Sequence, residues 1–176
     1  MSIVNSALTL GAGDDGYQIS RSLRLNSPDS AYLNRLFASA GNQKKWTWSG
    51  WVKRSKFGSL QFLFEGSSDA SIAFNNSDQL SFDLRPATTS YLITTTQVFR
   101  DPSAWYHVVC ACDTTLATAD DRMKMYVNGT QVTAFSTRTN PPQNLDGGIN
   151  NAATHYIGKY YASANYFLDG YLTEVY

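Results

Sequence analysis

The acidic residues are the first candidates for chemistry, because many glycosidases hydrolyse their substrates with two carboxylates held about 5 Å apart. Residues two apart on a β-strand lie on one face, but Glu65 and Glu174 have no acidic neighbour at that spacing. Asp120 and Asp121 are adjacent in a predicted loop, so their side chains point in different directions. The sequence therefore predicts no enzyme, and a glycosidase with carboxylates from different strands stays a minor alternative.

The histidines and cysteines form no catalytic or metal-binding motif. Cys110 and Cys112 are two apart on one predicted strand, so their Cβ directions are parallel and a disulfide between them is disfavoured. His107 and His155 stand alone, and neither completes a C-x-C metal site or a nucleophilic triad. We expect two reduced core cysteines that behave as small hydrophobic residues, and a packed structural role for His107.

A calcium ion needs six or more oxygen ligands, usually several carboxylates or loop carbonyls. Loop acids that qualify by residue type are Asp29, Asp69, Asp113, Asp120 and Asp121. Acidic loop residues are more often simply solvated. The sequence therefore predicts no metal and no redox or organic cofactor, and a structural calcium ion is left open.

Two polar loops have the residue types that bind sugars. Flat aromatic faces pack against sugar C–H groups, and amides or carboxylates hydrogen-bond the hydroxyls in shallow sites. The stretch "GKYYASANYF" supplies Tyr160, Tyr161, Asn165 and Tyr166, and "TNPPQNLDGGINN" supplies Asn140, Gln143, Asn144, Asp146 and Asn150. We predict a carbohydrate site at Tyr160, Tyr161, Asn165, Tyr166, Asn144 and Asp146. The alternative is ordinary loop exposure, which β-sandwiches show routinely.

A basic and aromatic stretch, "KKWTWSGWVKR", has the composition of a platform for single-stranded nucleic acid. Lys and Arg number 14, as do Asp and Glu, so the formal net charge is zero and no long-range field attracts nucleic acid. We favour a core strand of tryptophans with basic residues at its solvated ends. No nucleic-acid partner is predicted.

The elements that must position these residues are short strands. Aromatic residues make up 14% of the chain, which favours β-structure. In "QLSFDLR", Leu80, Phe82 and Leu84 face one side, and Met123, Met125 and Val127 do so in "RMKMYVN". Asn128-Gly129 predicts a tight hairpin. Similar runs are "ISRSLRLN", "SAYLNRL", "WTWSGWVKR", "SLQFLFEG", "ASIAFN", "SYLITTT", "WYHVVCACD", "TQVTAF", "THYIGKY" and "FLDGYLTEVY".

About a dozen short antiparallel strands must bury their apolar faces against a second layer, which predicts an all-β, two-sheet antiparallel jelly-roll β-sandwich. The domain is expected over residues 19–176, after a flexible N-terminal arm at residues 1–18 that is rich in Gly and Asp. "FLDGYLTEVY" stops with its alternation intact, which suggests truncation at the C-terminus. We expect no signal peptide and no transmembrane segment.

Four motifs in the correct order are similar to the laminin-G-like, concanavalin A-like lectin/glucanase fold. They are "WTWSGWVKR", "WYHVVCACD", "MYVNG" and "YIGKYYASANYFLDGYLTEVY". The resemblance implies a jelly-roll sandwich, and it implies that hydrolases on this scaffold carry E-x-D-x-E on one strand, which this chain lacks. It also implies that an acid in the closing strand often holds a structural ion. Thr173 stands at that position, which weakens the calcium case.

The wording of "GYQISRSLRLNSPDSAYLNR" and "TTTQVFRDPSAWYHVV" resembles laminin-G-like modules of tailed-bacteriophage structural proteins, such as tail fibres. This resemblance implies a virion protein whose partners are host-surface glycan and other virion subunits. It also leaves open that copies of the chain form a homo-oligomer. We therefore expect a non-catalytic, lectin-like module whose copies gain avidity together. The alternative is a purely structural capsid or tail decoration protein without a ligand.

Overall fold

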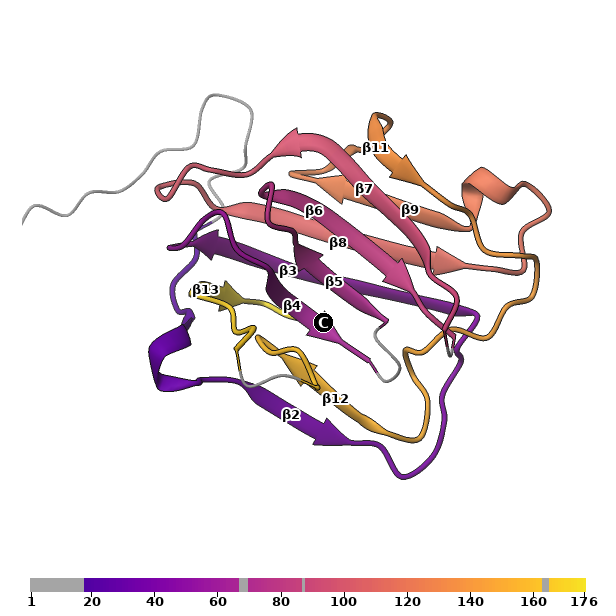
Figure 1. Ribbon diagram of the computed structural model, residues 1–176, viewed down its shortest axis with the longest axis horizontal. Helices are drawn as coiled ribbons and strands as arrows, with labels where there is room; N and C mark the ends of the chain where they lie inside the picture. Colours follow the sequence, from indigo (N-terminus) through magenta and orange to yellow (C-terminus); the bar gives the residue numbers. More distant parts are fainter. Residues whose placement is uncertain (1–17, 67–69, 87, 163–164) are drawn as a thin grey trace, which may run out of the picture.

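The computed structural model is a sandwich of two β-sheets, shown in Figure 1. It describes residues 18–66, 70–86, 88–162 and 165–176. The predicted arm at residues 1–18 therefore lies, except for Gln18, outside the described residues. The described chain contains 13 strands and two short 3₁₀ turns, so the predicted all-β class is confirmed. No helix in these ranges has the length and apolar character needed to cross a bilayer.

The first sheet has six antiparallel strands with β3 near its centre. Its longest strand, β3 (Lys45–Arg54), pairs with β8 over eight residues, from Lys45 opposite Asp113 to Val52 opposite Tyr106. The order across the sheet is β1 (Leu23–Leu25), β13 (Gly170–Thr173), β3, β8 (Tyr106–Asp113), β9 (Met123–Val127) and β10 (Thr130–Gln131).

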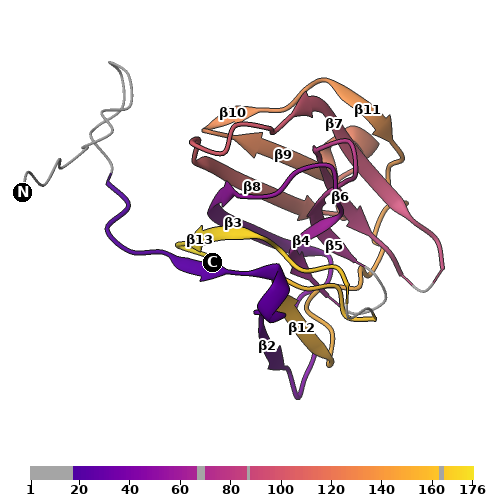
Figure 2. The same cartoon turned by 60° about the vertical axis from the view of Figure 1, so that its left-hand side comes forward.

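The second sheet has seven antiparallel strands and brings distant parts of the chain together. Its edge strand β2 (Leu33–Leu36) pairs with β12 (Thr154–Ile157), and Arg35 lies opposite His155. Figures 1 and 2 show these two strands side by side at one end of the sandwich. The order is β11 (Phe135–Arg138), β7 (Tyr91–Val98), β6 (Gln79–Leu84), β5 (Ser71–Phe74), β4 (Gln61–Glu65), β12 and β2.

The core forms where alternate residues of both sheets meet. The apolar faces predicted for β6 and β9 are confirmed, because Leu80, Phe82 and Leu84 are fully buried, as are Met123 and Met125, and Val127 is nearly so. Cys110 and Cys112 are buried and reduced, as predicted. Burial raises the pKa of both thiols because it disfavours the thiolate.

The predicted hairpin at Asn128-Gly129 is confirmed. Both residues have positive φ, 50° and 78°, and Thr130 pairs with Val127 across the turn. The short strand β11 is poorly foreseen, because the run "TQVTAF" shares only Phe135 with it. The alternation in "QLSFDLR" places Asp83 on the solvent side, but Asp83 is buried. Ser90 and Arg85 hydrogen-bond its carboxylate and keep it satisfied there.

A buried charge network lies at the C-terminal end of β3. Arg54 is fully buried, and its Nη2 donates to Asp78 Oδ1 at 3.0 Å, while its Nη1 donates to the Phe99 carbonyl at 2.7 Å. Asp78 also accepts from Arg100 Nε and from the Gly58 amide, both at 2.7 Å. The network ties the turn between β5 and β6 to β3.

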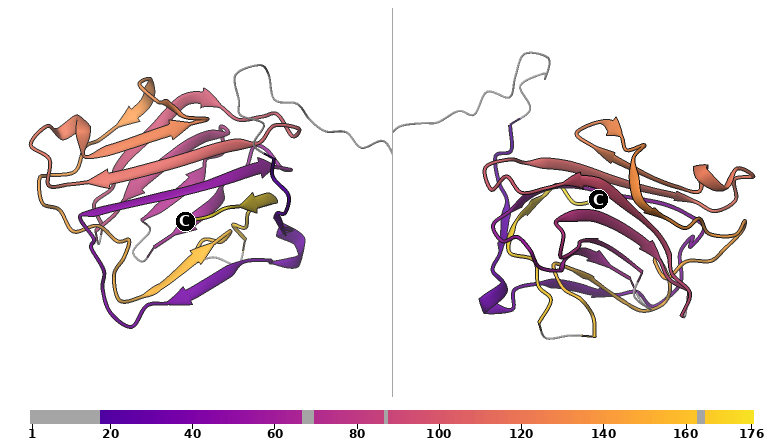
Figure 3. Two further views of the ribbon diagram at one scale, coloured as in Figure 1. Left: turned by 180° about the vertical axis from the view of Figure 1, so that it is seen from behind. Right: turned by 45° about the horizontal axis from the view of Figure 1, so that its top comes forward.

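The residues after β13 run beside the middle of β3. After β13, Glu174 adopts a left-handed φ of 51°, and Tyr176 then exchanges two backbone hydrogen bonds with Ser49. Strands β1 and β13 are only three and four residues long. Figure 3 (left) shows the C-terminal end between β3 and β12. The remaining length of β3 therefore faces β2 and β12 across a groove.

Candidate functional site

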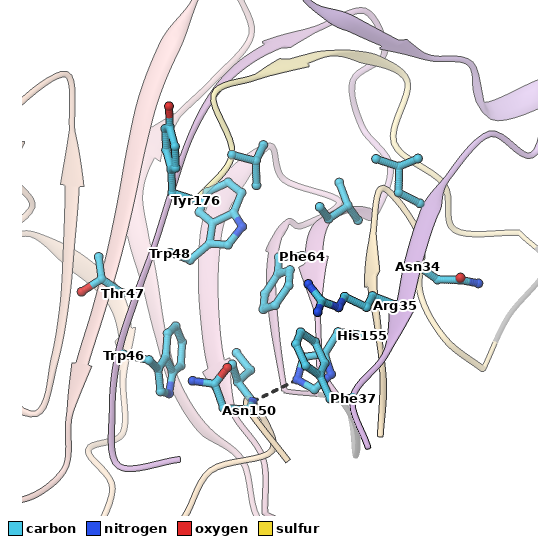
Figure 4. A pocket seen from close by; sticks show the side chains of 14 residues that line it. Asn34, Arg35, Phe37, Trp46, Thr47, Trp48, Phe64, Asn150, His155 and Tyr176 are labelled. Atoms are coloured by element: carbon cyan, nitrogen blue, oxygen red, sulfur yellow. Dashed lines mark hydrogen bonds between the residues drawn. The ribbon is translucent and has the colours of Figure 1, made fainter. Parts of the chain in front are cut away.

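The groove between the two sheets has a volume of about 480 Å³. Figure 4 shows the 14 side chains that line it. One wall is β3, the opposite wall is β2 and β12, and Phe64 of β4 lies between them. This volume falls in the range of typical small-ligand pockets.

The lining is mainly aromatic. Trp48 of β3 is 3% exposed and stacks on Phe64 with ring centroids 6.4 Å apart. Trp46 is half-buried and packs edge-on against Phe82 at 5.3 Å. Both indoles lie on the inward face of β3, because even-numbered residues of this strand face the core. Their N–H groups are shielded and have no hydrogen-bond acceptor among the described residues.

His155 fixes the wall on the β12 side. Its Nε2 accepts the backbone N–H of Asn150 at 2.9 Å, drawn as a dashed line in Figure 4, so its Nδ1 carries the proton and donates to the Ala153 carbonyl. Burial lowers the pKa of His155, so the ring is neutral near pH 7. Phe37 meets the imidazole edge-on at 4.9 Å. The histidine thus positions the loop residue Asn150 and the rim residue Phe37.

Arg35 carries the formal charge of the groove. It is exposed on β2, lies 5.0 Å over the Phe37 ring, and reaches in toward Phe64 and His155 in Figure 4. No lining residue is Asp or Glu, and Arg35 has no ion pair with any described residue. The lining chemistry is therefore aromatic and cationic.

The predicted tyrosines come together elsewhere, in a patch that we call the tyrosine patch and define by Tyr160, Tyr161 and Tyr166. Tyr160 stacks on Phe62 at 4.9 Å, and the other two rings meet its edge at 5.2 and 6.0 Å. Tyr161 and Tyr166 are each 42% exposed. Asn165 is exposed in the same loop.

The other two predicted sugar-binding residues lie apart from this patch. Asp146 forms an ion pair with Lys44 at 3.3 Å, and the backbone N–H of Asn144 donates to the Thr114 carbonyl. Their loop continues to Gly148, which packs on Gly66 just beyond the end of β4, whereas the patch stacks on Phe62 near its start. The two halves of the predicted set therefore lie toward opposite ends of β4, and the predicted site stays a prediction.

The loop acids that the structure describes do not gather into a cation site. In the described ranges, no three His, Cys, Asp or Glu residues come together as metal ligands. Asp69 lies outside those ranges. The other acids have their own neighbours: Asn26 donates to Asp29, Lys45 pairs with Asp113, Arg138 with Asp120 and Lys124 with Asp121. Thr173, at the position of the expected acid, pairs with Trp51 in the sheet.

The sequence indicated Asn150 as a polar loop residue and the tryptophans as core residues. It did not predict that they share a groove with Arg35, Phe37 and His155. The signal was weak, because β2 and β12 lie about 120 residues apart and meet only through strand pairing. His107 departs from the expected core position as well. It is half-buried on the outer face of its sheet, 5.0 Å from Trp51.

The known proteins that this chain resembles have the same fold. A family model described as the concanavalin A-like lectin/glucanases superfamily (Laminin_G_3) matches residues 26–176. No curated protein matches. Domains LG4-5 of the mouse laminin α1 chain superpose with a TM-score of 0.61 at 11% identity, over 89% of this chain and 41% of that chain.

Two bacterial structures superpose comparably. The CBM40 module of a Ruminococcus gnavus sialidase, bound to α2,3 sialyllactose, gives a TM-score of 0.55 at 13% identity, over 84% of this chain and 91% of that one. Domain 4 of an extracellular arabinanase of Geobacillus stearothermophilus, in complex with arabinotriose, gives 0.55 at 15% identity, over 88% and 68%. At these identities the likeness shows the fold alone. The chain spans about two fifths of the length of some matches, 40% and 41% in two of them.

Proposed function

This chain belongs to the concanavalin A-like lectin/glucanases superfamily, and we propose that it acts as a non-catalytic carbohydrate-binding module. The groove carries this proposal. Trp46, Phe64 and Phe37 offer aromatic faces for sugar C–H groups, and Arg35 and Asn150 offer polar contacts at the same concavity. Structural neighbours that are sugar-binding modules on the same fold support it.

The non-catalytic part of the proposal rests on the lining. Glycoside hydrolysis needs two carboxyl groups on either side of the scissile bond. None of the residues that line the groove is acidic, and Glu65 and Glu174, the acids adjacent in sequence to lining residues, do not line it. His155 is buried with both ring nitrogens hydrogen-bonded, so it is not placed as a general base.

A glycan array probed with a multivalent form of the chain tests the function, because multivalency raises a weak single-site affinity. A sugar that binds the groove covers Trp46, so it protects tryptophan fluorescence from quenching by acrylamide. A blank array, neutral and acidic sugars included, contradicts the proposal.

Paired variants locate the site. Phe37→Ala removes a rim ring of the groove, whereas Tyr161→Ala removes an exposed ring of the tyrosine patch. We expect a roughly five- to tenfold loss of sugar affinity for Phe37→Ala, since an aromatic contact of this kind contributes on the order of 1–1.5 kcal/mol. A loss confined to Tyr161→Ala would move the site to the patch.

The biological setting is a second part of the proposal. We propose that the parent protein is a phage virion component, in which the module recognises host-surface glycan and contacts other virion subunits. The likeness of residues 16–35 and 94–109 to phage structural modules supports this setting. Mass spectrometry of purified particles tests it, and a chain absent from the particle contradicts it.

The alternative from another class is a purely structural decoration or assembly role. It predicts that the exposed apolar side chains of β2, among them Leu36 at 70% exposure, become buried against a neighbouring subunit. Hydrogen exchange of assembled particles would show protection over β2 without any effect of sugars. That result, with a blank array, favours the structural role.

A further inference from the structure

We propose that the groove selects saccharides that carry a carboxylate, and that Arg35 is the residue that reads this group. The inference rests on the proposed carbohydrate-binding function and adds the class of sugar. Its basis is the distribution of charge around the groove, which is one-sided.

Arg35 is a cation that has no carboxylate partner in the part of the chain that the structure describes. It lies at the mouth of the groove on the edge strand β2, where its guanidinium is held 5.0 Å over the Phe37 ring. None of the ion pairs in the described residues involves Arg35. By contrast, Arg54, Arg85, Arg100 and Arg138 each have a carboxylate partner. A guanidinium presents parallel N–H donors that match a carboxylate in a bidentate pair.

No carboxylate among the residues that line the groove neutralises this charge. His155 is neutral, its Nε2 accepts from Asn150, and its Nδ1 donates to Ala153. Glu65 pairs in register with Tyr156, one position from the groove residues Phe64 and Ile157, and Glu65 is not among the lining residues. A carboxylate that enters the groove therefore meets one cation and aromatic walls.

The walls strengthen this contact. Trp48 and Phe64 line the floor, and ion pairs are stronger where apolar surface excludes water than on an open surface. The phenyl ring of Phe37 orients the guanidinium before the ligand arrives, which lowers the ordering cost of the pair. The sugar ring then packs on the aromatic wall while its carboxylate faces β2.

The experiment compares matched sugars on the full chain. Methyl β-D-glucuronide and methyl β-D-glucoside differ only at C6, which is a carboxylate in the first and a hydroxymethyl group in the second. Binding of each is measured by calorimetry and by tryptophan fluorescence. We expect the acid to bind at least roughly tenfold more tightly, as charge-assisted hydrogen bonds do, with the preference shrinking as salt rises. N-acetylneuraminic acid and a sulfated glucoside extend the series to other carboxylates and to sulfate.

Arg35→Gln and Arg24→Gln form the matched pair of variants. Arg24 is an exposed arginine on the edge strand of the other sheet and also lies over an aromatic ring, Tyr171, at 5.8 Å. Arg35→Gln is expected to bring the acid to the affinity of the neutral sugar, and Arg24→Gln to change nothing. Arg35→Lys keeps the charge but loses the fork, so it retains part of the preference.

The outcomes separate the two proposals. If neutral and acidic sugars bind equally, or if Arg35→Gln and Arg24→Gln behave alike, carboxylate selection is wrong while carbohydrate binding stands. A stronger preference for the sulfated glucoside than for the glucuronide also overturns it. If no sugar of either kind binds, the carbohydrate function itself fails.

Discussion

The Arg54–Asp78 network gives a sharp test of how the sandwich is held together. Asp78→Asn is the appropriate change, because Asn has nearly the same shape and tolerates the left-handed φ of 61° found at this residue. The substitution removes the negative charge and replaces one acceptor oxygen with a donor. Arg54, whose side chain is 0% exposed, then carries an uncompensated buried charge.

The expected cost follows from this burial. Removing one partner of a buried pair typically costs about 3–5 kcal/mol of unfolding free energy. In a domain of this size, each kcal/mol lowers Tm by about 2–4 °C, so the expected drop is roughly 6–20 °C. The remaining partners of Arg54, the Phe99 carbonyl and the Phe74 ring at 4.3 Å, keep the loss toward the lower part of that range.

Two further variants isolate the cause, with urea unfolding followed by tryptophan fluorescence. Arg100→Gln removes the other cationic partner of Asp78, but Arg100 is 60% exposed, so about 0–1 kcal/mol is expected. The double variant Arg54→Met with Asp78→Asn removes both buried charges and should be more stable than Asp78→Asn alone. A double variant no more stable than Asp78→Asn alone would refute the reasoning.

Four other predictions concern pH, the patch and the core. Burial raises the pKa of Asp78, but its hydrogen bonds more than offset this and hold the pKa below the usual value. Its contribution to stability is therefore full above about pH 4 and is lost as the pH falls through the folded pKa. The stability of Asp78→Asn should depend less on acid than that of the unchanged chain. Burial lowers the pKa of His155. The contribution of the neutral ring to stability is therefore full above about pH 6.5 and is lost as the pH falls from there toward the folded pKa. The C2–H resonance of His155 should titrate below the usual midpoint. Tyr160→Ala removes the ring that supports the tyrosine patch and leaves Phe62 uncovered, so about 2–4 kcal/mol of stability should be lost in denaturant unfolding. Cys110 and Cys112 should resist Ellman's reagent in the native state and react only after denaturation, and rapid labelling of the folded chain would contradict their burial.

Most strands were predictable because they are specified locally, although β11 was not. Alternation alone places Leu80, Phe82 and Leu84 inward, and the need for positive φ at both positions explains the turn at Asn128-Gly129. Asp83 shows the limit of this rule. Its carboxylate stays satisfied when buried because Ser90, seven residues away and just before β7, supplies a donor that no period in the sequence reveals.

The groove was not predictable for a related reason. Its cation, Arg35, lies in a run that reads as an ordinary strand, and only the pairing of that strand with His155 brings it beside the tryptophans of β3. Alternation predicts each strand separately, but it does not predict which distant strands form the two walls of one groove.

The four edge strands have a consequence for how many copies can be held close together. Strands β1, β2, β10 and β11 are two to four residues long, and the first two carry Arg24 and Arg35. Short edges offer few unpaired backbone groups, and like cations repel, so neighbouring copies have little tendency to join into a continuous sheet. Dense arrays of this module should therefore remain separate units, each with its own opening accessible from solution.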